Sequence, residues 1–214
     1  MQEQKKMTGK EFLLNLITGY EACSRFGRAA TLHSDMHAHG TWGTMGAAAT
    51  ALLASESSLE EVVEGVNVSA TFSLPTIWSS AIEGKLIRNV YVGHSIEAAI
   101  QSVKLTTAGY KAPEGNLEYV FTKLLGSKWD ESQLHWEPDT PWDIEQNYFK
   151  SYAFCRYTHA PLEAFKSIVL ERSLAPQDIK CVNVSTYSRA ATLSNQNYHN
   201  SLSAKFSIPY AIAS

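Results

Sequence analysis

Residues 37–49 read HAHGTWGTMGAAA, with two histidines just ahead of a glycine-rich turn that opens an alanine-rich segment. We expect this segment to be a helix that runs from about Thr44 to Ala54. Backbone N–H groups in the first turn of a helix have no partner within the helix, and the helix dipole favours an anion beside them. A histidine next to such a turn can move protons near neutral pH, so His37 is a candidate for chemistry on a carboxylate or phosphate.

Helical spacing continues on both sides of this stretch. Thr8–Glu11 and Ser58–Glu61 each have a serine or threonine followed three residues later by glutamate, which is the capping-box pattern of a helix start. We therefore predict one helix from the first motif to about Phe26 and another that begins at the second motif. A further helix is predicted over Asn89–Ala108, and Gly93 within it is expected at a close helix–helix contact.

The pattern changes in the second half of the chain. Tyr148–Tyr157 is rich in aromatic residues and Ile179–Tyr187 alternates in character, so both are predicted as strands. Between them, a proline in the first-turn position leads into an amphipathic helix that ends near Leu170. The chain is therefore expected to be mostly α with an α+β part.

Three parts follow from this pattern. Residues 1–126 are expected to form a partial, all-helical large domain. Residues 127–146 hold three of the five tryptophans and two prolines among scattered polar residues, which predicts an irregular connection. Residues 147–214 are expected to form part of a smaller α+β domain.

Composition limits the function classes. Eighteen basic residues against 21 acidic residues give a formal net charge of −3, so no surface for nucleic acid is expected. No apolar run approaches the roughly 18 residues that span a bilayer, and the polar start has no signal-peptide pattern. The three cysteines are far apart and form no CxxC motif, which is typical of reduced cytosolic thiols. We therefore expect a cytoplasmic protein that binds neither nucleic acid nor membrane.

Metal binding is not expected. His37 and His39 match the HxH pair of some metal-dependent hydrolases, but no strand is predicted before them and no further ligand set accompanies them. His39 is expected to have a structural or surface role. Cys155 is expected to be a buried small hydrophobe rather than a nucleophile.

Several cations are candidates for binding an anionic substrate. Arg88 stands just before a predicted helix, where its guanidinium could grip a carboxylate with two hydrogen bonds. Lys150 and Arg156 have the same parity on a predicted strand, so both should face one side, and His159 lies at the end of that strand. Two cations on one face suit a di- or tricarboxylate, although an exposed polar strand edge would give the same pattern.

Four motifs in this order carry a resemblance to a known family. They are HAHGTWGTMGAAA (37–49), RNVYVGH (88–94), YFKSYAFCRYTH (148–159) and NSLSAKFSIPY (200–210). The chain resembles the MmgE/PrpD family, which includes 2-methylcitrate dehydratase, cis-aconitate decarboxylase and iminodisuccinate epimerase. The resemblance implies a large helical domain and a smaller α+β lid domain, with the active site between them. It also implies homodimers, small polycarboxylate substrates, no cofactor, and proton transfer at a carbon next to a carboxylate.

The resemblance also assigns roles to particular residues. His37 matches the active-site histidine of the helical domain, and Lys150 matches the lid lysine that faces the cleft. Tyr210 matches a lid tyrosine near the substrate. These three are the expected catalytic residues, and the expected substrate-binding residues are Arg88, Lys150 and His159.

Family chains are longer, so we expect this chain to correspond to the central part of the family's usual chain. Two hypotheses remain open. One is a lyase-type enzyme, similar to 2-methylcitrate dehydratase, that acts on a small polycarboxylate. The other is a truncated or split family member that has no activity of its own and needs a complementary chain.

Overall fold

The computed structural model describes residues 7–214, which form two compact units. Unit 1 runs to Ile77 and resumes over Asn89–Asn147, whereas unit 2 comprises Trp78–Arg88 and Tyr148–Ser214. Helices dominate, and residues 7–214 contain a single sheet of two strands. The prediction of a mostly α chain with an α+β part is confirmed.

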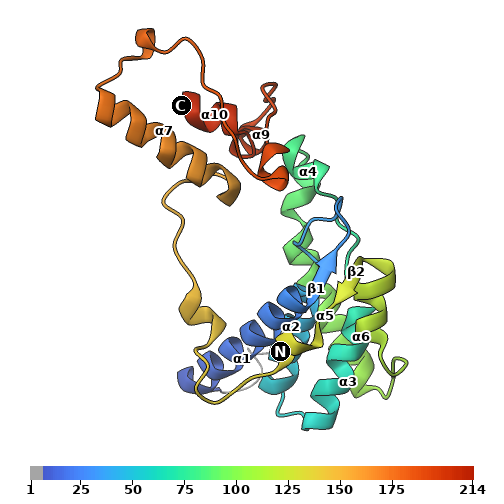
Figure 1. Ribbon diagram of the computed structural model, residues 1–214. Coiled ribbons are helices and arrows are strands. Elements are labelled where there is room, and N and C mark those ends of the chain that lie inside the picture. The colour runs from blue at the N-terminus through green and yellow to red at the C-terminus, as the bar shows by residue number, and fades with distance from the viewer. Residues whose placement is uncertain (1–6) are drawn as a thin grey trace. The chain divides into compact units, whose positions relative to one another are not determined.

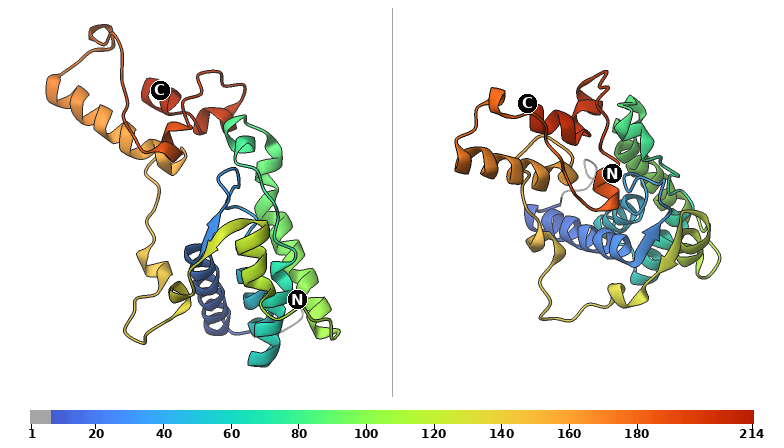
Figure 2. Two further views of the ribbon diagram at one scale, coloured as in Figure 1. Left: turned by 45° about the vertical axis from the view of Figure 1, so that its right-hand side comes forward. Right: turned by 45° about the horizontal axis from the view of Figure 1, so that its top comes forward.

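Unit 1 is a group of packed helices (Figures 1 and 2). Its helices are α1 (Gly9–Ala29), α2 (Gly43–Ala54), α3 (Leu59–Ala70), α5 (Tyr91–Thr107) and α6 (Asn116–Tyr119), followed by a π-helical turn over Val120–Leu124. Both predicted capping boxes are confirmed, because the side chains of Thr8 and Ser58 accept the N–H groups of Glu11 and Glu61. Local sequence therefore sets where α1 and α3 begin.

Helices α1 and α2 approach each other through two glycines. A Cβ added at Gly19 would lie 2.8 Å from the carbonyl oxygen of Gly46 and would also collide with the Thr50 side chain. A Cβ added at Gly46 would lie 2.9 Å from the carbonyl oxygen of Gly19 and would collide with Cys23. Only glycine at both positions allows the two backbones to come this close.

A short antiparallel sheet closes unit 1 beside this helix pair. Strand β1 (Ala30–Leu32) follows α1 directly and pairs with β2 (Gly126–Trp129), with Ala30 opposite Trp129. The sheet covers a core in which Phe121 and Met45 are fully buried. Burial of such side chains is the main term that stabilises the unit.

The predicted connection over residues 127–146 belongs to unit 1 and packs on α1. Its 3₁₀ turns are η4 (Glu131–Leu134) and η5 (Asp143–Gln146). The Arg25 guanidinium bonds both the Glu21 carboxylate and the carbonyl oxygen of His135, and Glu21 also accepts the N–H of Asp143 at 2.8 Å. The segment is irregular in backbone but held by charged hydrogen bonds to one helix.

Unit 2 combines α7, which is its longest helix among the described residues, with several short helices (Figure 1). Its elements are α4 (Ser79–Ile82), η6 (Arg156–Thr158), α7 (His159–Arg172), η7 (Pro176–Asp178), α8 (Ser188–Ala191), α9 (Ser201–Lys205) and α10 (Ile208–Ala213). The turn η2 (Leu86–Asn89) crosses the boundary to unit 1. The core of unit 2 contains Ala81, Leu193, Leu202, Phe206 and Ile208.

Residues 78–88 join unit 2 through a specific contact. The side-chain amide of Asn200 donates to the carbonyl oxygen of Gly84 at 2.9 Å, and Gly84 has a positive φ of 70°. A Cβ at Gly84 would overlap Asn200, so glycine is required both for the turn and for the approach. This excursion out of the first unit was not predicted from the sequence.

Both predicted strands of the second half are wrong. Tyr148–Tyr157 bends and then turns into η6. Cys155 donates its backbone N–H to the carbonyl oxygen of Lys205, but this single bond does not continue into a strand pairing. Ile179–Tyr187 forms no pairing, and within residues 7–214 the backbone N–H groups of residues 180–186 have no hydrogen-bond partner. A strand needs a neighbour to satisfy its backbone, and alternation alone does not supply one.

Over residues 7–214, the structure contains no helix whose length and apolarity would let it cross a bilayer.

The two glycine positions in helices give opposite stability predictions. Gly46→Ala should lower the free energy of unfolding by about 1–3 kcal/mol, because the new methyl group overlaps α1. Gly93→Ala is the control, because the position is helical and a Cβ there meets nothing within 4 Å. It should raise the free energy of unfolding by about 0.5–1 kcal/mol. Urea unfolding followed by circular dichroism measures both, and equal effects of the two changes would contradict the close α1–α2 contact.

The same observation corrects the prediction for Gly93. That residue was expected at a close helix–helix contact, but the space around it is open.

Candidate functional site

His37 lies in unit 1, in the loop between β1 and α2, with only 4% of its surface exposed. Its backbone is held on both sides by Thr76. The His37 N–H donates to the Thr76 carbonyl oxygen at 2.9 Å, and the Thr76 hydroxyl donates to the His37 carbonyl oxygen at 2.6 Å. The adjacent Met36 and Ile77 form an antiparallel bridge. The position of His37 is therefore fixed by backbone bonds to a segment about forty residues away.

The imidazole of His37 is oriented by its own loop. The backbone N–H of His39 donates to Nδ1 of His37 at 3.0 Å. The His39 ring lies 4.3 Å from the His37 ring, and Tyr91 packs edge-on at 6.3 Å, measured between ring centroids. One ring nitrogen thus meets the backbone, which fixes the direction of the other.

The turn after His37 leads into α2 as predicted. Gly40 has a φ of 89°, and the Thr41 hydroxyl donates to the carbonyl oxygen of Ala38 at 2.5 Å. Thr44, in the first turn of α2, is fully buried, and its hydroxyl has no hydrogen-bond partner within residues 7–214. A buried hydroxyl without a partner in the first turn of a helix is a polar group available to an anion.

In unit 2, three of the candidate residues gather around Phe154. The Lys150 ammonium and Nε2 of His159 each lie 3.4 Å from the Phe154 carbonyl oxygen. The Tyr210 ring packs edge-on against the Phe154 ring at 6.3 Å between centroids. Lys150 is exposed, whereas His159 is buried at 7%. Phe154 therefore contacts the ammonium of Lys150, the imidazole of His159 and the ring of Tyr210.

Arg88 lies beside Phe206, the residue that follows α9. Its guanidinium carbon lies 5.5 Å from the centroid of the Phe206 ring, a cation–π distance. Burial raises the pKa of the Cys155 thiol, and the positive charges of Lys150 and Arg88 act in the opposite direction. Both cations are thus close enough to Cys155 for their fields to reach it.

One nitrogen of the Arg88 guanidinium lacks a hydrogen bond within the described residues. Its Nε is buried and has no hydrogen-bond partner in the described part of the chain. Buried guanidinium N–H groups normally find an acceptor, and a carboxylate is the acceptor that matches their geometry. A carboxylate that binds at Arg88 could therefore accept a hydrogen bond from Nε.

The structure therefore brings together four of the five predicted site residues within unit 2 and places His37 in unit 1. The four are Arg88, Lys150, His159 and Tyr210. The last three contact Phe154, whereas Arg88 lies beside Phe206 and close enough to Cys155 for its charge to act on the thiol. Phe154 and Phe206 were not predicted, although both lie within the sequence motifs that contain Lys150 and Tyr210.

The predicted pairing of Lys150 with Arg156 on one strand face is wrong. Arg156 lies in the turn η6, and its guanidinium stacks 4.9 Å from the centroid of the Tyr148 ring. Without a strand, equal parity no longer places two side chains on one face.

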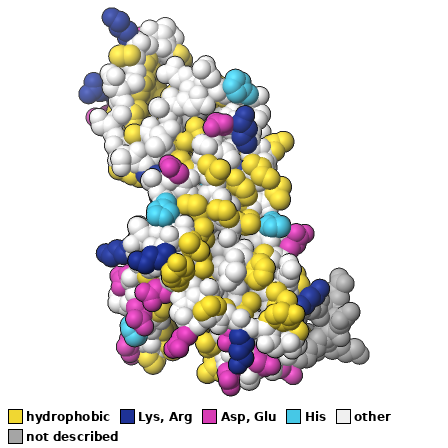
Figure 3. Space-filling model, turned by 90° about the vertical axis from the view of Figure 1, so that its right-hand side faces the viewer, with side chains coloured by type: hydrophobic (Ala, Val, Ile, Leu, Met, Phe, Trp, Pro, Cys, Tyr) yellow, Lys and Arg dark blue, Asp and Glu magenta, His cyan; other side chains and the backbone are white. Residues whose placement is uncertain are grey.

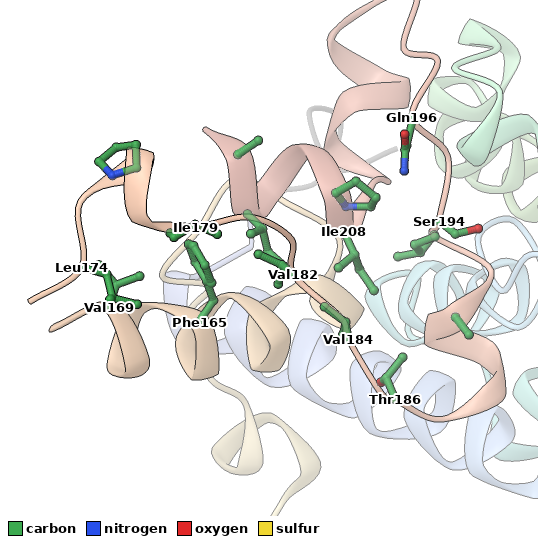
Figure 4. Close-up of a pocket in the computed structure, with 16 residues that line it drawn as sticks. Phe165, Val169, Leu174, Ile179, Val182, Val184, Thr186, Ser194, Gln196 and Ile208 are labelled. Carbon is green, nitrogen blue, oxygen red and sulfur yellow. The ribbon is translucent and has the colours of Figure 1, made fainter. Parts of the chain in front are cut away.

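Unit 2 also contains a cavity that none of these residues lines. It measures about 770 Å³ and lies between α7, α10 and the extended segment that follows η7 (Figure 4). Its walls are mostly apolar, with Phe165, Val182 and Ile208 among the lining side chains. An apolar cavity of this kind does not match the acidic substrate class expected from the cations.

Within residues 7–214, no three or more His, Cys, Asp or Glu side chains gather in a way that could hold a metal ion, and the pair His37 and His39 gains no third ligand.

Models of known protein families match both halves of the chain. The MmgE/PrpD N-terminal domain model matches residues 1–126, and the MmgE/PrpD C-terminal domain model matches residues 152–214. The chain belongs to the MmgE/PrpD family. In this family member, the N-terminal domain match includes residues 78–88, which pack with unit 2 in the structure. A search of curated proteins found no match to the chain.

The environments of the three cysteines predict an order of thiol reactivity in this MmgE/PrpD chain. Cys181 is exposed and should react first with iodoacetamide at pH 8. Burial raises the pKa of Cys23 to about 11 and also raises that of Cys155, so both thiols stay protonated at this pH. Labelling of Cys23 should accelerate only as the pH approaches 11. Peptide mass spectrometry over time measures the order, and early labelling of Cys23 in the folded chain would contradict it.

Proposed function

We propose that this MmgE/PrpD chain binds a small polycarboxylate and takes part in a lyase reaction of the 2-methylcitrate dehydratase type. A base removes a proton from the carbon next to a carboxylate, the electron pair of that C–H bond forms the new C=C bond, and the hydroxyl on the neighbouring carbon takes up a proton and departs as water. No cofactor is required for these steps. The observation that supports this proposal is the gathering of Lys150, His159 and Tyr210 around Phe154, with Arg88 beside Phe206 in the same unit.

In this proposal Arg88 and Lys150 bind the carboxylates of the substrate and stabilise the negative charge that develops during the reaction. Arg88 offers a fork of donors to one carboxylate, and its buried Nε gains an acceptor when that carboxylate binds. Lys150 is a compact exposed charge that can meet a second carboxylate. As the proton leaves carbon, negative charge moves onto the carboxylate oxygens, and fixed cations stabilise that charge more in the transition state than in the substrate.

Tyr210, His159 and His37 complete the proposal. The ring of Tyr210 is fixed between Phe154 and Tyr198, which lies at 4.8 Å, so its hydroxyl has a defined position. His159 is held by the Phe154 carbonyl and assists in binding the substrate. His37 is the general acid or base, since its ring is buried and oriented by the backbone.

Turnover tests this proposal directly. The purified chain is mixed with 2-methylcitrate, citrate or cis-aconitate, and ultraviolet absorbance reports the conjugated alkene. Lys150→Ala should lower kcat by about 10²–10³-fold, as expected for loss of one preorganised charge-stabilising donor. Lys180→Ala is the matched control, because it removes the same charge from an exposed position outside the cluster. Equal rates for both variants would remove Lys150 from the mechanism.

A binding measurement covers the case in which the chain alone does not turn over. Isothermal titration with citrate should show binding that Arg88→Ala weakens and Lys180→Ala does not. Binding without turnover, followed by activity when a second MmgE/PrpD chain is added, would favour a chain that needs a complementary polypeptide. Absence of both binding and turnover would reject the polycarboxylate proposal.

The same proposal includes association with a second copy of the chain. Val92, Ile96 and Ile100 recur every four residues on α5 and are 39–50% exposed, and α1 exposes Phe12 and Leu16. Apolar side chains are also visible among charged ones on the face drawn in Figure 3. Apolar rows of this kind on a surface typically mark an interaction site.

Substitution in the α5 row tests the association. Ile96→Glu should shift the mass in analytical ultracentrifugation from dimer to monomer, because it places a charge in the centre of the apolar row. Ile168→Glu is the control, since Ile168 on α7 has a similar exposure of 49%. A wild-type chain that stays monomeric at all concentrations would contradict the proposed dimer.

A further inference from the structure

The hydrogen bond to Nδ1 of His37 determines which ring nitrogen carries the proton. The donor is the backbone N–H of His39, at 3.0 Å, and a backbone N–H can only donate. Nδ1 must therefore present its lone pair. A neutral imidazole has one N–H group, so in His37 the proton is on Nε2.

The same contact opposes a positive charge on His37. Protonation would place an Nδ1–H directly against the His39 N–H, and two donors would face each other inside a residue that is 4% exposed. Two aromatic side chains pack on the ring, His39 at 4.3 Å and Tyr91 at 6.3 Å between ring centroids.

The local backbone makes this arrangement hard to change. His37 is bonded to Thr76 through its own N–H and through its carbonyl oxygen, so the ring cannot swing away with its loop. The next residues form the turn into α2, with Gly40 in the left-handed region. The bond to Nδ1 is therefore part of the fold rather than a side-chain preference.

We propose that His37 acts as a neutral imidazole that donates a hydrogen bond from Nε2 to a carboxylate oxygen of the substrate, and that it is not the base that accepts the carbon-bound proton. This assignment rests on the proposed function for the kind of substrate, and it replaces the general acid or base role of His37 with that of a hydrogen-bond donor. A neutral donor of this kind stabilises negative charge as it develops on the oxygen, while its own proton stays on Nε2.

Nuclear magnetic resonance of ¹⁵N-histidine-labelled chain tests the tautomer without any need for turnover. Long-range ¹H–¹⁵N correlations should show His37 with an unprotonated Nδ1 and a protonated Nε2, and His37→Gln assigns its signals. The pattern should persist at pH about 6, just below the ordinary histidine pKa of about 6.5. The exposed side chain of His94, whose Nδ1 lies 3.5 Å from Glu97, gives a reference signal in the same spectra. A protonated Nδ1 of His37 at neutral pH, or protonation of both of its ring nitrogens at pH about 6, would overturn the proposal.

Two changes at position 39 separate the backbone donor from the neighbouring ring. His39→Ala removes the ring and keeps the N–H, so the His37 tautomer should be unchanged. His39→Pro removes the N–H, so the Nδ1 signal of His37 should shift towards the value of a ring nitrogen without a hydrogen-bond partner. An unchanged signal in a folded His39→Pro variant would overturn the assignment. If that variant does not fold, the spectra of the wild type and of His39→Ala decide the question.

Kinetics then distinguish this proposal from the proposed function. His37→Gln keeps an N–H donor but cannot act as a base, so it should retain at least ten times the kcat of His37→Ala. Equal loss in both variants would overturn the donor role. The predicted tautomer in a chain that neither binds nor converts any of the three acids would instead reject the proposed function and leave the protonation state of His37 established.

Discussion

The backbone contact between α1 and α2 is the constraint on which unit 1 depends. Gly19 and Gly46 let the two helices meet without intervening side chains, and this fixes the distance that residues 30–42 must bridge. That bridge contains both β1 and the loop with His37. A side chain at either glycine would move the start of α2 relative to the end of α1, and the His37 loop is attached to both.

Unit 2 depends on a different kind of organisation. Its elements are short, and a single backbone carbonyl, that of Phe154, meets Lys150 and His159. The next residue, Cys155, bonds to the end of α9 through its N–H. Within residues 7–214, neither Lys150 nor His159 forms an ion pair, so the cluster can accept an anion without first breaking one.

Helix positions could be predicted from the sequence because the signals are local. A capping box lies within four residues, and both motifs define real helix starts. The strands at Tyr148–Tyr157 and Ile179–Tyr187 could not be judged in this way, since pairing depends on a partner segment that periodicity does not reveal. For the same reason the sequence did not indicate that Gly84 would meet Asn200, or that Arg156 would turn away from Lys150. The residue types of the site were predictable, whereas their neighbours were set by contacts distant in sequence.

The extended run from Lys180 to Tyr187 has a consequence for handling the protein. Within residues 7–214, the backbone N–H groups of residues 180–186 have no hydrogen-bond partner, and the run contains β-branched residues, no proline and a single charge at its start. Segments of this composition are typical starting points for self-assembly into cross-β aggregates, because another copy of the same run can complete the missing ladder. Concentrated samples should therefore lose material through this stretch before the helices of unit 1 unfold.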